Sequence, residues 1–147
     1  MQDVIFISLP TNDVEKATRF YTDLGWKFNP QMSDERGVCF SVTDTVYLMI
    51  MDREFMATFT TKKIVDPSET LQTQVAISAD TREEVDAFIE KVMAAGGAES
   101  GEAQDYDFMY TRDFEDPAGN HFAIQWMAPE AIALGPEEYM AQQAGKA

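Results

Sequence analysis

The period of hydrophobic and polar positions changes several times along the first third of the chain. The segment VIFISL, residues 4–9, is rich in β-branched and aromatic side chains, which is typical of a strand. Apolar side chains then recur with helical spacing over residues 14–24, and Gly25 ends that pattern. Three short strands are predicted next, at residues 26–28, 38–42 and 46–51. The pattern therefore predicts the order β-α-β-β-β.

The same order begins again after a polar segment. Residues 71–79 predict a strand, and Thr81-Arg82-Glu83-Glu84 matches a capping box, in which a hydroxyl and a carboxylate satisfy backbone N–H groups. The apolar stripe that follows ends at Gly96-Gly97. Further strands are predicted at residues 98–99, 108–113 and 121–126. Phe20 and Phe88 stand 68 positions apart at equivalent places, so the chain is an internal repeat of two β-α-β-β-β modules.

Residues 52–70 interrupt this repeat. Phe55, Met56 and Phe59 occupy a segment long enough for one or two helical turns, whereas Asp66-Pro67-Ser68 is typical of a loop. Two interpretations stay open. The segment is a linker that packs through its aromatic side chains, or it is a flap over a ligand site.

The most informative stretch is residues 109–126, which predict two strands joined by a turn. Asp116-Pro117 and residues 118–120 supply the turn, since Pro presets φ, and Gly and Asn tolerate positive φ. In the second strand Phe122, Ile124 and Trp126 share one face. The opposite face is semi-polar, which suits the wall of a cavity better than a packed interior.

The D-P-x-G-N turn, the strand after it and the two modules together resemble the vicinal-oxygen-chelate superfamily, which includes glyoxalase I, extradiol dioxygenases and bleomycin-resistance proteins. The resemblance covers roughly residues 3–127 and is strongest to the glyoxalase-like branch. It implies an α+β fold with one eight-stranded, cup-shaped mixed sheet, helices outside and a small-molecule site on the concave face. We expect one domain over residues 1–128, with module 1 at about 3–51, a linker at 52–70, module 2 at about 71–127 and a weakly helical tail at 129–147.

Composition narrows the possible functions. The net charge is −15, which argues against nucleic-acid binding because neutralising phosphates requires clustered Lys and Arg. That charge is compatible with a cationic ligand, although acidity that serves solubility is the favoured explanation. No apolar run approaches the roughly 18 residues of a membrane span, and the N-terminus lacks the features of a signal peptide. We therefore expect a cytoplasmic protein that does not contact membranes.

Single copies of cysteine and histidine exclude several kinds of site. Cys39 has no partner for an internal disulfide, and a role as a small buried apolar residue is favoured. His121 alone can form neither a Cys/His zinc cluster nor a two-His-one-carboxylate iron site within the chain. In metal-using members of the family four positions meet in the cup, and the resemblance puts them at Phe6, Met49, Gln74 and Ala123. Gln74 offers one neutral oxygen and Met49 a thioether that suits Cu(I), so we expect neither a metal nor another cofactor.

A tight turn at Asp116–Gly119 would pair Phe114 with His121, Arg112 with Ala123, and Tyr110 with Gln125. In that register Arg112 lies in the cup beside His121, which is the candidate catalytic residue. The predicted ligand-binding residues are Phe6, Trp26, Met49, Gln74, Phe108, Tyr110, Arg112, His121, Ala123 and Gln125. Less specific roles stay open: Arg112 pairs with an acidic neighbour, His121 is structural, and Phe6 and Met49 merely fill the cup.

Three functions fit these observations. The favoured one is a glyoxalase/bleomycin-resistance-like protein that binds a small molecule in a metal-free cup. The alternative is an enzyme of the same superfamily, of lyase, isomerase or dioxygenase type, which uses His121 with Arg112 or an atypical metal site; a metal-dependent dioxygenase is disfavoured. The third is a cup that serves only as a dimer scaffold or regulatory module. The resemblance also implies a homodimer, with apolar surface at residues 55–59 and from Ile132 onward available for burial.

Overall fold

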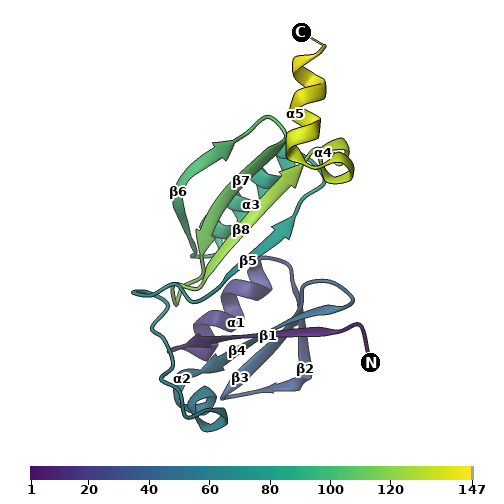
Figure 1. Ribbon diagram of the computed structural model, residues 1–147. Helices are drawn as coiled ribbons and strands as arrows, with labels where there is room; N and C mark the ends of the chain where they lie inside the picture. The colour runs from purple at the N-terminus through teal and green to yellow at the C-terminus, as the bar shows by residue number, and fades with distance from the viewer. Residues whose placement is uncertain (147) are drawn as a thin grey trace.

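The computed structural model describes residues 1–146 and contains the two predicted modules (Figure 1). Module 1 consists of β1 (Ile5–Thr11), α1 (Val14–Asp23), β2 (Lys27–Asp34), β3 (Gly37–Ser41) and β4 (Val46–Asp52). Module 2 consists of β5 (Gln74–Ser78), α3 (Arg82–Ala94), β6 (Ala98–Asp105), β7 (Met109–Glu115) and β8 (His121–Met127). The segment between them contains α2 (Arg53–Met56) and a 3-10 turn, η1 (Ala57–Phe59).

The eight strands form two four-stranded mixed sheets, in the orders β1-β4-β3-β2 and β5-β8-β7-β6. In each sheet the module's first strand runs parallel to its last, and the other neighbours are antiparallel. The α+β class and the tandem modules are thus confirmed. The strands do not join into a single hydrogen-bonded sheet of eight, however, and the two sheets are not closed on one another.

Local signals account for both long helices. Asp13 caps α1 by accepting a hydrogen bond from the Lys16 backbone N–H at 2.9 Å. Thr81 caps α3 in the same way at Glu84, and the Glu84 carboxylate accepts from the Asp80 backbone N–H, one residue earlier than in the usual capping box. Gly25 and Gly96 then follow the two helices with φ of +91° and +97°, in the left-handed region that glycine adopts without strain.

The helix-side faces of both sheets share one hydrophobic core. Tyr21 of α1 packs against Phe40 of its own module and edge-on against Phe122 of module 2. Trp26 also contacts Phe122, with ring centroids 6.2 Å apart. The fully buried side chains of this shared core are Phe20, Tyr21, Phe40, Leu48, Ile50, Val85, Ile89, Val92, Phe114 and Phe122. Because removing apolar surface from water is the main driving force of folding, this core binds the modules together.

The turn between β7 and β8 adds a polar connection between the modules. Asp116 is only 4% exposed and accepts hydrogen bonds from the Tyr21 hydroxyl at 2.6 Å and from the backbone N–H groups of Ala118 and Asn120. The Asn120 amide also donates to Asp116 and to the Pro10 carbonyl of module 1. Burial raises the pKa of Asp116 above its ordinary value, while these hydrogen bonds act in the opposite direction.

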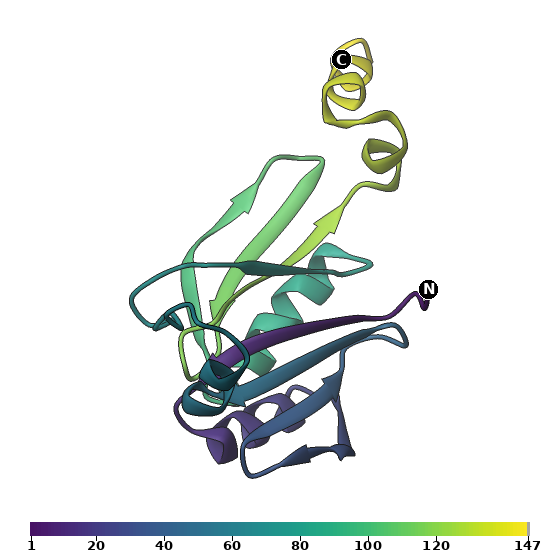
Figure 2. The same ribbon diagram turned by 60° about the horizontal axis from the view of Figure 1, so that its bottom comes forward.

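The C-terminal segment forms α4 (Pro129–Leu134) and α5 (Pro136–Ala144), which extend away from both sheets (Figures 1 and 2). The helical tail predicted from residue 129 onward corresponds to α4 and α5. In both views the linker passes near the C-terminal end of β1 before it enters β5. Among residues 1–146, every helix is too short or too polar to cross a membrane.

Candidate functional site

The β7–β8 hairpin differs from the predicted register by one residue. The Asp116 backbone N–H donates to the Asn120 carbonyl, so Glu115 pairs with His121 and Arg112 with Ile124. A shift of one residue moves a strand's side chains to the opposite face of the sheet. The predicted position of Arg112 opposite Ala123 is therefore wrong. The signal that identifies the true register is Phe114, which shares the parity of Arg112 and belongs in the core beside Phe122.

Arg112 lies on the helix side of the sheet and is held by two carboxylates. Its guanidinium contacts Asp86 of α3 at 2.7 Å and Glu99 of β6 at 2.7 Å. The hydrogen bond from Arg112, followed by one from Tyr110, lowers the pKa of Asp86. The less specific expectation is an ion pair with a neighbour such as Asp113 or Glu115. Arg112 does form ion pairs, but its partners are Asp86 and Glu99 of other elements.

Three more predicted ligand residues lie outside the concave faces. Tyr110 donates its hydroxyl to Asp86, and Trp26 stacks on Tyr21 in the core. Phe108 lies in the turn before β7, half-buried beside Tyr106. The register error explains Tyr110, since it shares the parity of Arg112.

The concave face of module 2 carries a polar cluster that includes an unpredicted residue. Asp113 accepts hydrogen bonds from the Gln74 amide at 3.1 Å and from His121 Nε2 at 3.0 Å. Because an ionised carboxylate only accepts, this contact puts the ring proton on Nε2. His121 Nδ1 faces Glu115 at 4.0 Å, beyond hydrogen-bonding distance. Ala123 is buried next to this cluster, and Gln125 is half-buried further along β8.

The concave face of module 1 is apolar by comparison. Phe6 is 50% exposed and stacks on Tyr47, with ring centroids 5.1 Å apart. Met49 lies two residues after Tyr47 on β4, on the same face of the sheet. It pairs with Ser8 of β1. These side chains cover the sheet, in line with the expectation that Phe6 and Met49 fill part of the cup.

The four family metal positions do not fit a divalent cation. Phe6 and Ala123 have no donor atom, Met49 offers only a thioether, and the Gln74 amide is bonded to Asp113. Within the described residues 1–146, no three His, Cys, Asp or Glu side chains gather in an arrangement able to hold a metal ion.

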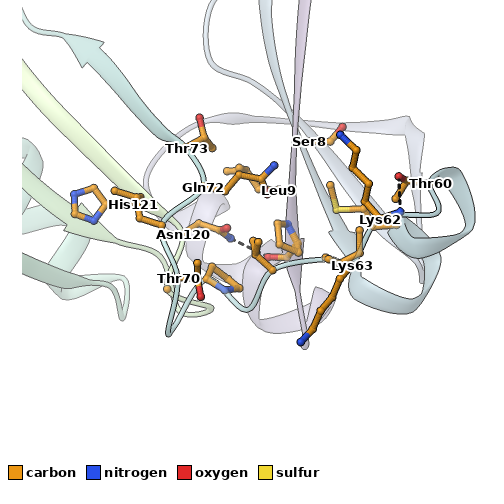
Figure 3. Close-up of a pocket in the computed structure, with 17 residues that line it drawn as sticks. Ser8, Leu9, Thr60, Lys62, Lys63, Thr70, Gln72, Thr73, Asn120 and His121 are labelled. Carbon is orange, nitrogen blue, oxygen red and sulfur yellow. Dashed lines mark hydrogen bonds between the residues drawn. The ribbon is translucent and has the colours of Figure 1, made fainter.

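A hollow of about 280 Å³ lies between β1, the linker and the start of β8 (Figure 3). Its apolar walls include Leu9, Ile64 and Leu71. Its polar lining residues are Ser8, Thr60, Lys62, Lys63, Thr70, Gln72, Thr73, Asn120 and His121. Among the predicted ligand residues His121 alone lines this hollow, and Figure 3 shows its ring on the side away from the lysines.

The linker is held in place by its own contacts. Asp52 caps α2, and the rings of Phe55 and Phe59 pack edge to face at 5.0 Å. Arg53 donates to the Ile64 carbonyl at 2.9 Å, which joins the two arms of the linker. The segment thus packs through its aromatic side chains and also forms a wall of a hollow, and its role as a flap over a ligand site stays a prediction.

A second hollow of about 280 Å³ adjoins the first. The two share Ser8, Met56, Thr60 and Ile64, and the second adds Met51 and Phe59. Its lining is mainly apolar, whereas the first hollow contains the lysines. Neither hollow was predictable from residue spacing, since both depend on how the linker folds back on β1.

Comparison with known structures identifies the fold. A hypothetical protein from S. aureus is 27% identical, with a TM-score of 0.72 over 86% of this chain and 95% of that one. A lactoylglutathione lyase from Agrobacterium tumefaciens is 19% identical, with a TM-score of 0.65 over 84% of this chain and 92% of that one. A glyoxalase/bleomycin resistance protein/dioxygenase family enzyme from Burkholderia phytofirmans PsJN is 18% identical, with a TM-score of 0.68 over 83% and 96% of the two chains.

These last two likenesses, at under 25% identity, establish the fold alone. No curated protein matches the sequence significantly. The model of one protein family, however, matches residues 4–124, which include both modules and the closing hairpin. The resemblance inferred from the repeat and the D-P-x-G-N turn is thereby confirmed: the chain belongs to the Glyoxalase/Bleomycin resistance protein/Dioxygenase superfamily.

Proposed function

We propose that this protein binds a small organic molecule in the hollow between β1 and the linker, without the help of a metal ion. One observation carries the proposal. The side chains of Ser8, Gln72 and Thr73 line this hollow and are exposed to solvent, and within residues 1–146 none of them makes a hydrogen bond to the protein, so each can bond a ligand in place of water. Polar groups that converge on a partly apolar hollow without protein partners are suited to fix a ligand's orientation.

The size of the hollow supports a small ligand. Its volume of about 280 Å³ is near the lower end of the range typical of small-molecule sites, roughly 300–1,000 Å³. The linker forms one wall of the hollow and β1 forms the other. A bound molecule would therefore contact both the linker and module 1. Ligand binding would then stabilise the folded linker by mass action.

A blocking variant tests this assignment. Ser8→Trp adds a bulky side chain inside the hollow, and Ser78→Trp makes the same change at an exposed strand position outside it. We expect fragments found by ligand-observed NMR screening of the wild type to lose at least about tenfold in affinity in Ser8→Trp, a cost of about 1.4 kcal/mol. Their affinity for Ser78→Trp should be unchanged. Equal binding to wild type and Ser8→Trp would refute the site.

A second candidate function is acid–base catalysis by His121, in an enzyme of lyase or isomerase type. It is favoured by the 3.0 Å contact with Asp113, which orients the ring and leaves Nδ1 able to accept a proton. Arg112 has no part in this version, because its guanidinium is engaged by Asp86 and Glu99. Asp113 is the positioning residue instead.

Lactoylglutathione lyase activity, the activity named for the Agrobacterium tumefaciens structure, provides a direct assay. If His121 is the base, His121→Asn abolishes turnover, and Asp113→Asn lowers kcat and changes its pH profile, since the amide no longer fixes the ring tautomer. Activity that survives His121→Asn would exclude this role.

We further propose a homodimer that covers the free edges of β1 and β5. Edge strands need protection against pairing, and the other two edges have it: β2 contains Pro30 and an irregular register, and β6 carries Glu99 and Glu102 with another irregularity. The β1 and β5 edges carry no charge; Pro10 lies near the C-terminal end of β1, and Ile5 at the other end of this strand is 59% exposed. Light scattering should therefore give twice the chain mass of 16.5 kDa, and a monomer at micromolar concentration would contradict this proposal.

A further inference from the structure

The charge of the hollow is opposite to that of the whole chain. The sequence has 26 acidic and 11 basic residues, yet the lining of the hollow includes Lys62 and Lys63 and not one Asp or Glu among the described residues. A pair of adjacent lysines without nearby carboxylates makes this a local positive region on a strongly negative molecule. The hollow therefore favours an anion where the remaining surface repels one.

Arginines and lysines differ in this structure: the arginines pair with carboxylates, whereas no lysine among residues 1–146 does. Each of the five arginines forms an ion pair: Arg19, Arg36, Arg53, Arg82 and Arg112. Lys62 and Lys63 form none within residues 1–146. Asp66, the nearest acid along the linker, accepts from Ser68 and lies 3.9 Å from Arg53. The Asp66 carboxylate is thus engaged by Ser68 and Arg53 and not by the two lysines.

The two lysines point in different directions. In Figure 3 the amino group of Lys62 extends toward Ser8, whereas the side chain of Lys63 extends away from it. The Lys62 backbone N–H donates to Thr60 Oγ1 at 3.1 Å, which occupies an acceptor site of that hydroxyl and leaves its O–H able to donate. Lys62, Ser8 and Thr60 therefore offer three donors to one region of the hollow.

The adjoining hollow supplies an apolar surface on the other side of these donors. Met51, Met56 and Phe59 line it, and Phe59 is 67% exposed although it is a large aromatic residue. Methionine side chains adapt to ligands of different shape. A molecule with an anionic end at Lys62 and an apolar body over Phe59 would use both hollows.

We propose that the ligand of this site is an organic monoanion: a carboxylate on an alkyl or aryl body, with its charge at Lys62, Ser8 and Thr60 and its body against Met51, Met56 and Phe59. The proposal rests on the proposed function of the same hollow. A single negative charge fits because Lys62 alone points inward, and the net charge of −15 opposes multiply charged anions.

Three compounds with the same alkyl body and different heads test the charge preference: octanoate, octan-1-ol and octylammonium. Titrations into the full-length protein by calorimetry at low ionic strength should show octanoate binding at least about tenfold more tightly than octylammonium, as expected for a charge-assisted contact. Added salt should weaken octanoate binding and leave octanol unaffected.

Two variants of neighbouring lysines separate a specific contact from general charge. Lys62→Gln should lower octanoate affinity about tenfold, as loss of a hydrogen bond to a charged group predicts, without changing octanol affinity. Lys63→Gln removes the same charge one residue away and should change octanoate affinity less than about twofold, because the Lys63 side chain extends away from Ser8. Equal effects of the two variants would overturn the assignment of Lys62.

The other possible results separate the proposed ligand class from the proposed binding site. If octanol or octylammonium binds as tightly as octanoate and Ser8→Trp blocks it, the hollow is a ligand site but the anion preference is refuted. If none of the three compounds binds, the inferred ligand class is refuted, while fragment hits that Ser8→Trp weakens would still support the proposed function. If neither these compounds nor any fragment responds to Ser8→Trp, both proposals are refuted.

Discussion

The two modules have the same order of elements and different concave faces. Module 1 presents Phe6 stacked on Tyr47, whereas module 2 presents Asp113 hydrogen-bonded to Gln74 and His121. On the helix side the modules are alike, because both contribute large apolar side chains to one core. The helix-side face therefore maintains the fold, and the concave face is the side on which the side-chain chemistry differs between the two modules.

The difference also bears on the site. Neither concave face by itself combines apolar walls with several unpartnered polar groups. Such a combination occurs where the linker crosses β1, between the apolar face of module 1 and the start of β8. The segment that breaks the repeat is therefore the one that shapes the proposed ligand site.

The largest expected effect separates the helix side from the concave side. Phe122→Ala removes a fully buried ring that stacks on Phe114 and contacts Tyr21 and Trp26, and should lower the free energy of unfolding by ~3–5 kcal/mol. Phe6→Ala, at a half-exposed ring, should cost ~1 kcal/mol or less. Urea unfolding measures both. Equal losses would mean that the concave face also maintains the fold.

The next effect concerns the polar connection between the modules. Tyr21→Phe removes the hydroxyl donated to buried Asp116 and should cost ~1–3 kcal/mol at pH 7. Tyr47→Phe is the control, since its exposed hydroxyl makes only a 3.4 Å contact, and should cost about 0.5 kcal/mol or less.

The pH dependence of Tyr21→Phe has a definite sign. Burial raises the pKa of Asp116, so this carboxyl contributes most to stability below its unfolded pKa of about 4, and the contribution is lost as pH rises through the folded pKa. The Tyr21 hydroxyl favours the ionised form, so its removal should cost more at pH 7 than at pH 4. A larger loss at pH 4 would contradict this.

A smaller effect is expected at Arg112. Arg112→Ala removes the pairs with Asp86 and Glu99 and should lower stability by about 1 kcal/mol at pH 7, after allowance for solvent screening. Octanoate affinity should stay unchanged, because Arg112 lies outside the hollow. A loss of binding in a folded Arg112→Ala protein would restore Arg112 to the site.

The cost of Arg112→Ala should fade in acid. Arg112 holds the pKa of Asp86 below its ordinary value, so this pair contributes stability above the unfolded pKa of about 4 and loses it as pH falls through the folded pKa. Unfolding curves at pH 7 and pH 3 measure the change. A cost that grows in acid would contradict the assignment of Asp86 as the partner.

The last prediction is that the purified protein binds no transition metal. Elemental analysis of the purified protein should find no stoichiometric Ni, Zn or Fe, because Phe6, Met49, Gln74 and Ala123 offer no anionic ligand. One metal ion per chain that is lost in Gln74→Ala would contradict this, and would make the concave faces more alike than we describe.

Local patterns were sufficient for most of the fold. The helical spacing before Gly25, the cap at Thr81 and the D-P-x-G-N turn are short-range signals, and each forms as predicted or nearly so. The two-module order followed from their repetition. The single eight-stranded sheet that the resemblance implied is not observed, because the strands divide into two sheets of four. No local pattern specifies whether β1 and β5 pair.

The site was harder to predict for two physical reasons. Strand faces reverse with a one-residue shift, so a small error at Asp116 exchanged Arg112 for Asp113 on the concave face. The hollow depends on how the linker lies against β1. The shape of the linker is fixed by its own contacts, namely the Arg53 hydrogen bond to Ile64 and the packing of Phe59 on Phe55. The position of His121 on the concave face was predicted from its parity within β8, which the register shift does not change.

The proposed ligand site lies where the linker crosses β1, beside Lys62 and Ser8, and not over the polar cluster of Asp113 and Gln74. A crystal structure of the protein grown with octanoate tests this placement. We predict electron density for the ligand between β1 and the linker, with its carboxylate beside Lys62 and Ser8. Ligand density on the concave face at Asp113 and His121, with none beneath the linker, would contradict the account.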